Sequence, residues 1–289
     1  NREFGYPIEG DDIGECWGIS AHPNGDGTVA SGAYKGMKLS ELWEKHPELF
    51  GDTGMDRFPL LVKIIDAKDD LSIQVHPDDA YAKAHENGSL GKTECWFILD
   101  CKENATLVVG HNAKTKEELE QMIHEGRWKE FIREIPIKPG DFIQIDPGTV
   151  HAIKGGTLLL ETQQSSDITY RVYDYDRLSN GKPRQLHIVQ SIDVITVPAK
   201  SADNSVVHIE KKDDAIQQLI QCPYYTVYRI DVEHRVETWQ DKPFVLMSVV
   251  EGEGTLNGTP LKKGDHLILP DGYGKVELQG RMQIIASTI

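Results

Sequence analysis

The sequence has no apolar run that approaches the ~18–20 residues a membrane-spanning helix needs. It also shows no charged and then apolar leader of the signal-peptide kind. Basic residues are few: 31 Lys and Arg stand against 46 Asp and Glu, a formal net charge of -15, and no Lys/Arg-rich stripe offsets the excess. Because this charge repels polyanions, we expect neither nucleic acid nor a membrane as partner.

Cysteine is scarce as well. The four residues, Cys16, Cys95, Cys101 and Cys222, are scattered and form no C-x-x-C pair. Such spacing in a long chain is typical of reduced thiols and argues against a disulfide framework. We therefore expect a cytoplasmic protein, in which an anionic small substrate would need a local cationic pocket.

Short strand patterns dominate what the sequence does contain. Residues 60–65 form a nearly continuous apolar run of strand length, and residues 71–76 alternate apolar with polar side chains. The alternation predicts a strand with Gln74 and His76 on one face. Residues 92–99 resume strand character. From residue 135 onward, strand patterns and Gly/Pro turns follow one another, which favours a mainly β barrel or sandwich.

A few helices and loops are expected to interrupt the strands. Cap and breaker residues set their bounds. The expected helical segments are 37–50 (Ser40 as N-cap, Gly51 at the end), 78–86 (closed by Gly88) and 115–134 (Thr115 as N-cap, divided at Gly126). The expected loop is 178–187, and the expected linker is 198–215.

The chain contains an internal echo. Residues 138–151, KPGDFIQIDPGTVH, are similar to residues 262–275, KKGDHLILPDGYGK. The repetition predicts two related β modules in tandem. Gly274 or Lys275 stands in the second copy where His151 stands in the first, so we expect the second module to lack this candidate ligand.

Four polar residues on three predicted strands form a candidate metal site. Gln74 and His76 offer an amide oxygen and an imidazole, Glu94 a carboxylate, and His151 a second imidazole just after a Pro-Gly turn. Zinc accepts such N and O donors, and a catalytic zinc site leaves one position open. The same donors also suit iron, manganese, cobalt or nickel, so this reasoning leaves the metal open.

Longer motifs around these residues resemble a known family. The segment LSIQVHPDDAYAKAHENGSLGKTECWFIL is similar to the metal-site region of class I mannose-6-phosphate isomerases of the short bacterial type, and PGDFIQIDPGTVH resembles the second metal motif of the cupin superfamily. Further matches are ECWGISAHP, FPLLVKIIDAKDDLSIQVHP, TKEELEQMI and LLETQQSSDITYRVYDYDR. The combination of Q-V-H-P, K-x-E and G-T-V-H-A-I makes the resemblance specific.

The resemblance implies a fold and an assignment of residues. It implies two tandem cupin-like jelly-roll β-barrel modules: residues 1–200 as the catalytic domain with helical insertions, and residues 201–289 as a degenerate module without metal ligands. One Zn²⁺ per chain would be held by four ligands. The implied site residues are Gln74, His76, Glu94 and His151 as zinc ligands, with Arg171, Lys92 and Glu161 as catalytic residues of the pocket.

The implied reaction is an aldose–ketose isomerisation of a phosphorylated hexose, between mannose 6-phosphate and fructose 6-phosphate. A proton moves between C2 and C1 through a cis-enediolate, whose charge a divalent cation stabilises. The base is left open among Glu161, Lys92 and a hydroxide on the metal. Arg171 either holds the phosphate or stabilises the enediolate, unless it forms a structural ion pair with Asp174 or Asp176.

Two other kinds of protein are alternatives to an isomerase of this family. Another metal-dependent cupin enzyme, such as a dioxygenase or a different sugar-phosphate isomerase, shares the donor types. An iron oxygenase is expected to use two His and one carboxylate, and Gln74 and Lys92 argue against it. A non-catalytic sugar-binding cupin would hold no metal tightly and would lose nothing on chelation.

Overall fold

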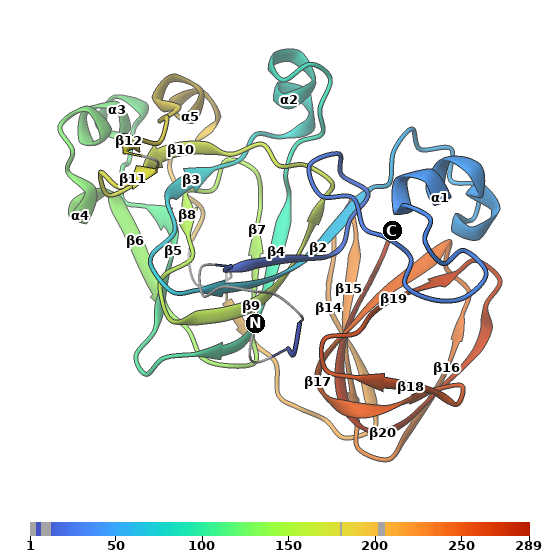
Figure 1. The fold of residues 1–289 in the computed structure, drawn as a ribbon. Coiled ribbons are helices and arrows are strands. Elements are labelled where there is room, and N and C mark those ends of the chain that lie inside the picture. The colour runs from blue at the N-terminus through green and yellow to red at the C-terminus, as the bar shows by residue number, and fades with distance from the viewer. Residues whose placement is uncertain (1–3, 7–12, 180, 202–205) are drawn as a thin grey trace. The chain divides into compact units, whose positions relative to one another are not determined.

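The computed structural model of the protein describes residues 4–6, 13–179, 181–201 and 206–289. The chain forms two compact units, one of Ile65–His208 and one that combines Asn1–Ile64 with Ile209–Ile289. Both are built mainly of strands, as Figure 1 shows. Within the described residues, no helix is long and apolar enough to cross a membrane.

The Ile65–His208 unit contains two sheets in a jelly-roll-like arrangement. The first includes, in sequence order, β4 (Glu94–Cys101), β7 (Asp141–Ile145), β9 (Thr157–Gln164) and β13 (Val206–His208). The second consists of β3 (Ile73–Val75), β5 (Thr106–His111), β6 (Ile132–Pro136), β8 (His151–Ala152) and β10 (Tyr170–Tyr173). In space their orders are β9-β4-β7-β13 and β10-β3-β8-β5-β6.

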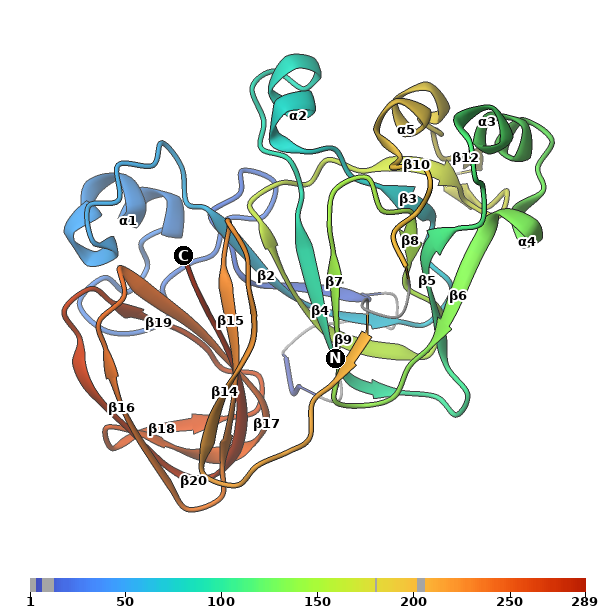
Figure 2. The same ribbon diagram turned by 180° about the vertical axis from the view of Figure 1, so that it is seen from behind.

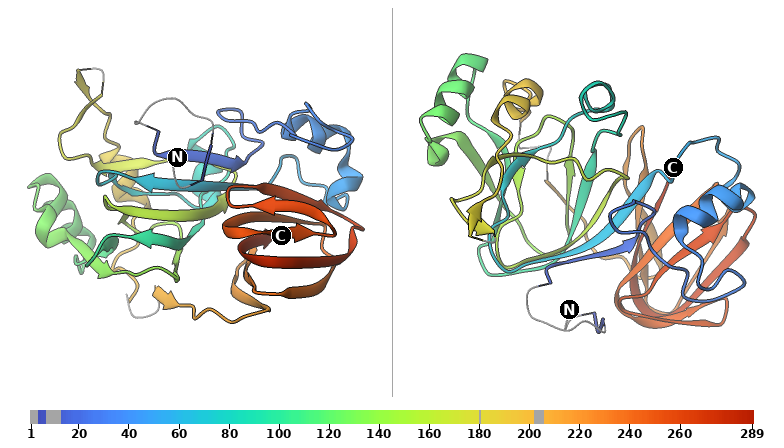
Figure 3. Two further views of the ribbon diagram at one scale, coloured as in Figure 1. Left: turned by 60° about the horizontal axis from the view of Figure 1, so that its bottom comes forward. Right: turned by 45° about the horizontal axis from the view of Figure 1, so that its top comes forward.

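Helices cover one face of the second sheet. The helices of this unit are α2 (Asp79–His85), α3 (Lys116–His124), α4 (Trp128–Phe131) and α5 (Ile188–Val194). Leu119 of α3 and Phe131 of α4 pack in one buried cluster with Val75 and Ala152 of the sheet. Figure 3 shows α3 and α5 on the same side of the unit. Since side chains alternate along a strand, the neighbours of Val75 and Ala152 point to the opposite face.

The second unit contains a C-terminal module, residues 215–289. Its strands, visible in Figure 2, are β14 (Ala215–Gln221), β15 (Thr226–Val232), β16 (Arg235–Gln240), β17 (Phe244–Leu256), β18 (Thr259–Lys262), β19 (His266–Pro270) and β20 (Gly274–Thr288). They form one sheet around a buried apolar cluster that includes Ile230, Val249 and Ile284. The same unit carries β1 (Glu15–Ile19), α1 (Leu39–Lys45) and the 3-10 helix η1 (Pro47–Phe50).

The internal echo corresponds to one repeated turn. Gly140 and Gly264 both adopt left-handed backbone angles, with φ of 88° and 92°. In each copy the following aspartate accepts a 2.8 Å hydrogen bond from the backbone N–H three residues earlier. Each turn then leads into a strand, β7 or β19. The repetition in the sequence therefore reflects a repeated local structure.

One predicted helix is shorter than expected. Residues 37–50 split into α1 and η1, and Lys38 rather than Ser40 is the N-cap. Ser40 lies inside α1, where its hydroxyl donates to Asp26. Pro47 has no N–H and begins a separate helix, which explains the break. Gly51 ends the segment at φ 70°, as predicted.

Three other boundaries were also wrong. The helical prediction ran to residue 134, but residues 132–134 belong to β6. The expected loop 178–187 contains a small hairpin, β11 (Leu178–Ser179) paired with β12 (Lys182–Pro183). The expected linker 198–215 contains β13, which pairs with β7, and part of it (202–205) lies outside the described residues. Each strand forms because a partner strand is close in space, which local composition does not reveal.

Candidate metal centre

The two histidines of the centre lie at the ends of two neighbouring short strands of the second sheet. His76 follows directly after β3, and His151 begins β8. Gly148, in the Pro-Gly turn before β8, donates its backbone N–H to the His76 carbonyl at 2.9 Å. This bond joins the turn to the end of β3. It fixes the two histidines relative to each other.

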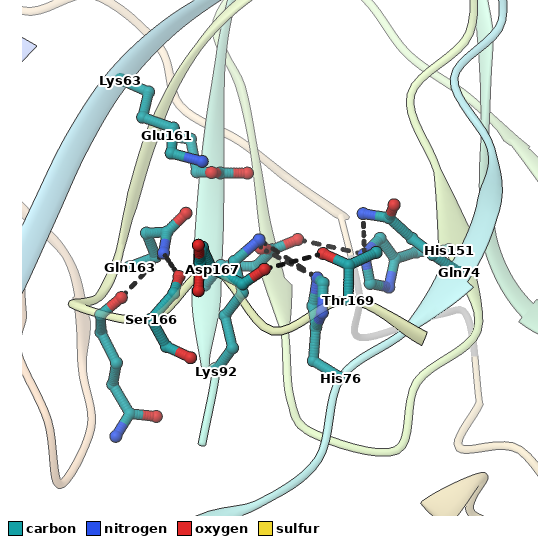
Figure 4. A network of polar contacts seen from close by, with 12 residues as sticks. Lys63, Gln74, His76, Lys92, His151, Glu161, Gln163, Ser166, Asp167 and Thr169 are labelled. Carbon is teal, nitrogen blue, oxygen red and sulfur yellow. Dashed lines mark hydrogen bonds and ion pairs between the residues drawn. The ribbon is translucent and has the colours of Figure 1, made fainter. Parts of the chain in front are cut away.

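Glu94 faces both histidines from the first sheet. Its Oε1 lies 3.2 Å from His151 Nε2, and its Oε2 lies 3.4 Å from His76 Nε2. All three side chains are buried, and their ligand atoms lie within 4.8 Å of one another. Among the described residues this is the one group of three or more His, Cys, Asp or Glu that fits a metal ion. Figure 4 shows His76 and His151 directed toward a common centre.

The outer nitrogens of both rings determine which atoms face that centre. Nδ1 of His76 donates to the Ile168 carbonyl and Nδ1 of His151 to the Thr149 carbonyl, both at 2.8 Å. A carbonyl oxygen only accepts, so each Nδ1 carries the proton and each neutral ring presents an unprotonated Nε2. Hydrogen bonds of this kind, made by the ring nitrogen that faces away from the metal, orient imidazoles that bind metals. Two lone pairs and a carboxylate therefore converge, an arrangement that a cation stabilises.

The protonation states agree with this geometry. Burial, and then the nearby Lys92 charge, lower the pKa of His76 to about 3. Burial also lowers the pKa of His151. Burial acts to raise the pKa of Glu94, but Lys92 and the two imidazoles outweigh it and hold this pKa well below its usual range. At neutral pH the donors are two neutral imidazoles and one carboxylate, which suits zinc and other borderline divalent metals.

Lys92 places a cation in contact with this group. Its Nζ lies 2.8 Å from Glu94 Oε2 and 3.2 Å from His76 Nε2, and its side chain is buried. Lys92 and Glu94, two residues apart, therefore point the same way. The ammonium shows that these donors attract positive charge.

Gln74 lies beside His151 with its amide nitrogen toward the centre. Its Nε2 donates to His151 Nε2 at 3.2 Å, while its Oε1 accepts a 3.3 Å hydrogen bond from Ser72. A carbonyl oxygen is the atom that could bind a metal. Rotating the amide by 180° would exchange the two atoms without moving the backbone. The structure thus brings Gln74 to the centre but turns its oxygen away.

Arg171 lies on β10 as the cross-strand neighbour of Gln74. Its backbone is fixed on both sides by His187, through bonds of 3.2 and 2.8 Å. Its Nε is buried and has no hydrogen-bond partner within the described residues. Asp174, a partner considered for it, instead binds Arg177 and Arg184. Burial and then Arg184 lower the pKa of Arg171. This donor is therefore available for a ligand.

Glu161 is set apart from the two histidines, as Figure 4 shows. It lies on β9 opposite Trp96, and its Oε2 accepts a 2.9 Å hydrogen bond from Trp96 Nε1. The Trp96 ring in turn packs edge-on against His151, with 5.5 Å between ring centroids. Glu161 is buried. Trp96 therefore links Glu161 to His151.

The sequence reasoning missed a group of contacts from residues 163–169. The Ile168 carbonyl orients His76, as described above. Gln163 donates its amide to the Ser166 carbonyl at 2.6 Å, and Gln164 accepts from the Thr93 backbone N–H at 2.9 Å. The polar run QQSS was visible within a family motif. The function of this run was not visible, because the residues that it contacts lie far away in the sequence.

A jelly-roll-like β module with two imidazoles and a carboxylate converging inside it defines a cupin-type protein with a candidate metal centre. Comparisons with known proteins point to one family. The family model for the catalytic domain of type I phosphomannose isomerase matches residues 5–97, and that for the mannose-6-phosphate isomerase cupin domain matches residues 215–289. The chain belongs to the type I phosphomannose isomerase family, a metal-dependent family of isomerases.

Similar proteins support this membership along nearly the whole chain. Mannose-6-phosphate isomerase ManA of Bacillus subtilis is 52% identical, over 99% of this chain and 92% of its own. Mannose-6-phosphate isomerase of Streptococcus mutans is 48% identical, over 99% and 92%. The crystal structure of mannose 6-phosphate isomerase from Bacillus subtilis superposes with a TM-score of 0.92 at 49% identity, over 100% and 93%. The predicted family and the mainly β cupin fold are confirmed.

Proposed function

We propose that this chain interconverts mannose 6-phosphate and fructose 6-phosphate with one Zn²⁺ held by His76, Glu94, His151 and, after rotation of its amide, Gln74. The convergence of two unprotonated Nε2 atoms and the Glu94 carboxylate within 4.8 Å carries the proposal. The names of the relatives, at 52% and 48% identity, support the substrate pair.

The bound metal would supply a Lewis acid that stabilises negative charge on the sugar oxygens in the cis-enediolate. The chain's own residues bind and orient the substrate. Arg171, with a buried Nε that lacks a partner in the described structure, is placed to accept an anionic group, either the phosphate or the enediolate oxygens. The burial of His76, Glu94 and His151 limits the access of water to the reacting atoms.

Proton transfer needs a group that can accept and return a proton between C1 and C2. Lys92 and Glu161 are the two protein candidates. Lys92 has its Nζ at the centre, in contact with Glu94 and His76. Glu161 is a buried carboxylate whose Oε2 accepts from Trp96 Nε1, and the Trp96 ring packs against His151. The shorter path to the centre favours Lys92, whose ammonium would first have to lose a proton, as a bound metal cation beside it and burial would promote.

We also propose that residues 1–200 form the catalytic module and residues 201–289 a module without metal ligands, in a cytoplasmic protein. Every residue assigned a role above lies in the first range. The residue at the position of His151 in the repeated motif is Gly274 or Lys275, and Lys275 forms an ion pair with Glu237 at 2.8 Å.

A coupled assay with mannose 6-phosphate, run on protein whose metal content is measured by elemental analysis, tests the proposal. We expect turnover together with close to one zinc per chain. Turnover without bound metal would refute the metal assignment. Stoichiometric metal without turnover of mannose 6-phosphate would refute the substrate and favour another metal-dependent cupin enzyme.

A further inference from the structure

The segment that leads into β4 is tied to two other parts of the chain. Residues 90–93 precede Glu94, and Lys92 lies within them. The Lys92 backbone N–H donates to the Pro77 carbonyl at 3.0 Å, and the Leu90 carbonyl accepts from the Ser166 hydroxyl at 3.0 Å. Pro77 follows His76 directly. Residues 90–93 therefore contact both the backbone that follows β3 and the residues that follow β9.

Gln164 is the centre of this connection. Its Oε1 accepts from the Thr93 backbone N–H at 2.9 Å, and its Nε2 donates to Asp79 Oδ1 at 3.0 Å. Its own backbone N–H donates to the Thr93 carbonyl at 3.0 Å. A backbone N–H only donates and an ionised carboxylate only accepts, so these partners fix the orientation of the amide. Gln164 is 4% exposed, which protects the bonds from water.

Asp79 completes the connection from the first turn of α2. The same Oδ1 that binds Gln164 also accepts the Gly91 backbone N–H at 2.7 Å. Gly91 packs so closely on this turn that a Cβ atom there would lie 2.4 Å from the Asp78 carbonyl carbon. Asp79 and Gln164 thus hold the 90–93 segment directly against the backbone that follows His76.

We propose that Gln164 and Asp79 are positioning residues that fix Lys92 and Glu94 relative to His76. Thr93, which Gln164 holds, lies between Lys92 and Glu94, and Asp79 is three residues beyond His76. Metal and catalytic groups have to be held within ~0.5 Å of the productive geometry, and bonds to the residues around them supply that precision. This inference rests on the proposed role of His76 and Glu94 as metal ligands.

The sharpest test is Gln164→Glu, alone and combined with Asp79→Asn. The single variant keeps an acceptor for Thr93 but turns a carboxylate oxygen toward Asp79, so two anions face each other. We expect kcat to fall ~10–100-fold, the range typical for losing such outer contacts, with KM changed less than about threefold because Gln164 is not assigned to substrate binding. Loss of zinc to a chelator should become faster by a similar factor.

The double variant distinguishes positioning from a general structural effect. The amide introduced at position 79 can donate to the carboxylate introduced at position 164 while its oxygen accepts from Gly91, which restores a donor between the two side chains. We expect kcat and zinc retention to recover to within about threefold of the wild type. The matched control is Gln144→Glu, since Gln144 also donates its amide to an aspartate, Asp146, at 3.3 Å, but lies on β7 outside this connection. It should leave kcat and zinc retention unchanged.

Several results would overturn the inference. Gln164→Glu with wild-type kcat and zinc retention would do so, as would a folded double variant no better than the single one. If melting curves show that Gln164→Glu does not fold, Asp79→Ala provides the test, because it removes the partner but leaves the bond between Gln164 and Thr93. Wild-type zinc retention and kcat in Asp79→Ala would then refute it. Wild-type protein without metal or turnover would instead refute the proposed function.

Discussion

Glu94 Oε1 and His151 Nε2 lie 3.2 Å apart, although the two residues belong to different sheets of the same unit. No turn joins β4 directly to β8, so this contact exists only because the two sheets face each other. His76 Nε2 approaches the other carboxylate oxygen at 3.4 Å. The candidate centre is therefore a property of the sheet packing.

His151→Ala should remove bound metal and reduce isomerase turnover by more than ~100-fold, because even the loss of an outer contact to a ligand costs 10–100-fold. Elemental analysis and the coupled assay measure both effects. Lys275→Ala is the control, because Lys275 occupies the corresponding region of the repeat and pairs with Glu237 on the surface. Retained metal in His151→Ala would exclude His151 as a ligand.

Dialysis against a chelator should abolish turnover, and zinc should restore it. The reason is that the proposed cis-enediolate would then lack its stabilising cation. Circular dichroism before and after dialysis separates loss of metal from unfolding. Unchanged turnover in a sample that elemental analysis finds free of metal contradicts the proposed mechanism.

Arg171→Ala should lower turnover by ~10²–10³-fold, the cost typical of removing one donor to a developing or bound anion, while the zinc content stays near wild type. Arg171 neighbours Gln74 in the sheet but is not a metal donor. Arg171→Lys keeps the charge and should recover only part of the activity, since it lacks the planar pair of donors. Loss of zinc from Arg171→Ala would show that its assigned role is wrong.

The unit with the C-terminal module should lose stability in mild acid through His266. Burial lowers the pKa of His266 to about 4, against a smaller opposing effect of Asp265. An unfolded histidine titrates near ~6.5. Between these values the unfolded chain binds a proton that the folded chain does not, so the free energy of unfolding falls as pH falls, by up to ~3 kcal/mol at pH 4.

Denaturant unfolding of His266→Gln at pH 7 and pH 5 tests this. The decrease in unfolding free energy between the two pH values should be ~2 kcal/mol smaller than in the wild type. Tyr6→Phe is the matched control: it removes the 2.8 Å hydrogen bond to His266 Nε2 but keeps the titrating imidazole, so its pH dependence should stay close to wild type. Equal pH dependence in His266→Gln and wild type would contradict the assignment.

The strand around Gln74 and His76 was predictable because its evidence is local. Alternation over residues 71–76 places Ile73 and Val75 on one face, and both are buried in the cluster under the helices. The polar residues between them must then face the opposite side. The turn before His151 was also predictable from local sequence, because the motif contains a Pro-Gly pair there. Gly148 of that pair adopts a left-handed φ of 80°.

The contacts of residues 163–169 and the strand β13 could not be predicted in this way. Val206–His208 is a strand because β7 offers it free backbone groups, at a register that places Val206 opposite Ile143. Gln164 binds Asp79, and Ile168 binds His76, across long separations in the sequence. Such partners depend on sheet order and register, which a local stretch of sequence does not encode.

The sequence by itself determined the chemistry available to this protein: the amide, imidazole, carboxylate and cationic side chains, the strands that carry them, and the motifs that place the chain in its family. The tertiary structure decided which of these groups meet. It directed Nε2 of His76 and His151 toward Glu94, turned the Gln74 oxygen toward Ser72, left Nε of Arg171 without a partner in the described residues, and paired Asp174 with other arginines. The physical reason is that side-chain type is local, whereas distance and orientation arise only when distant strands pack.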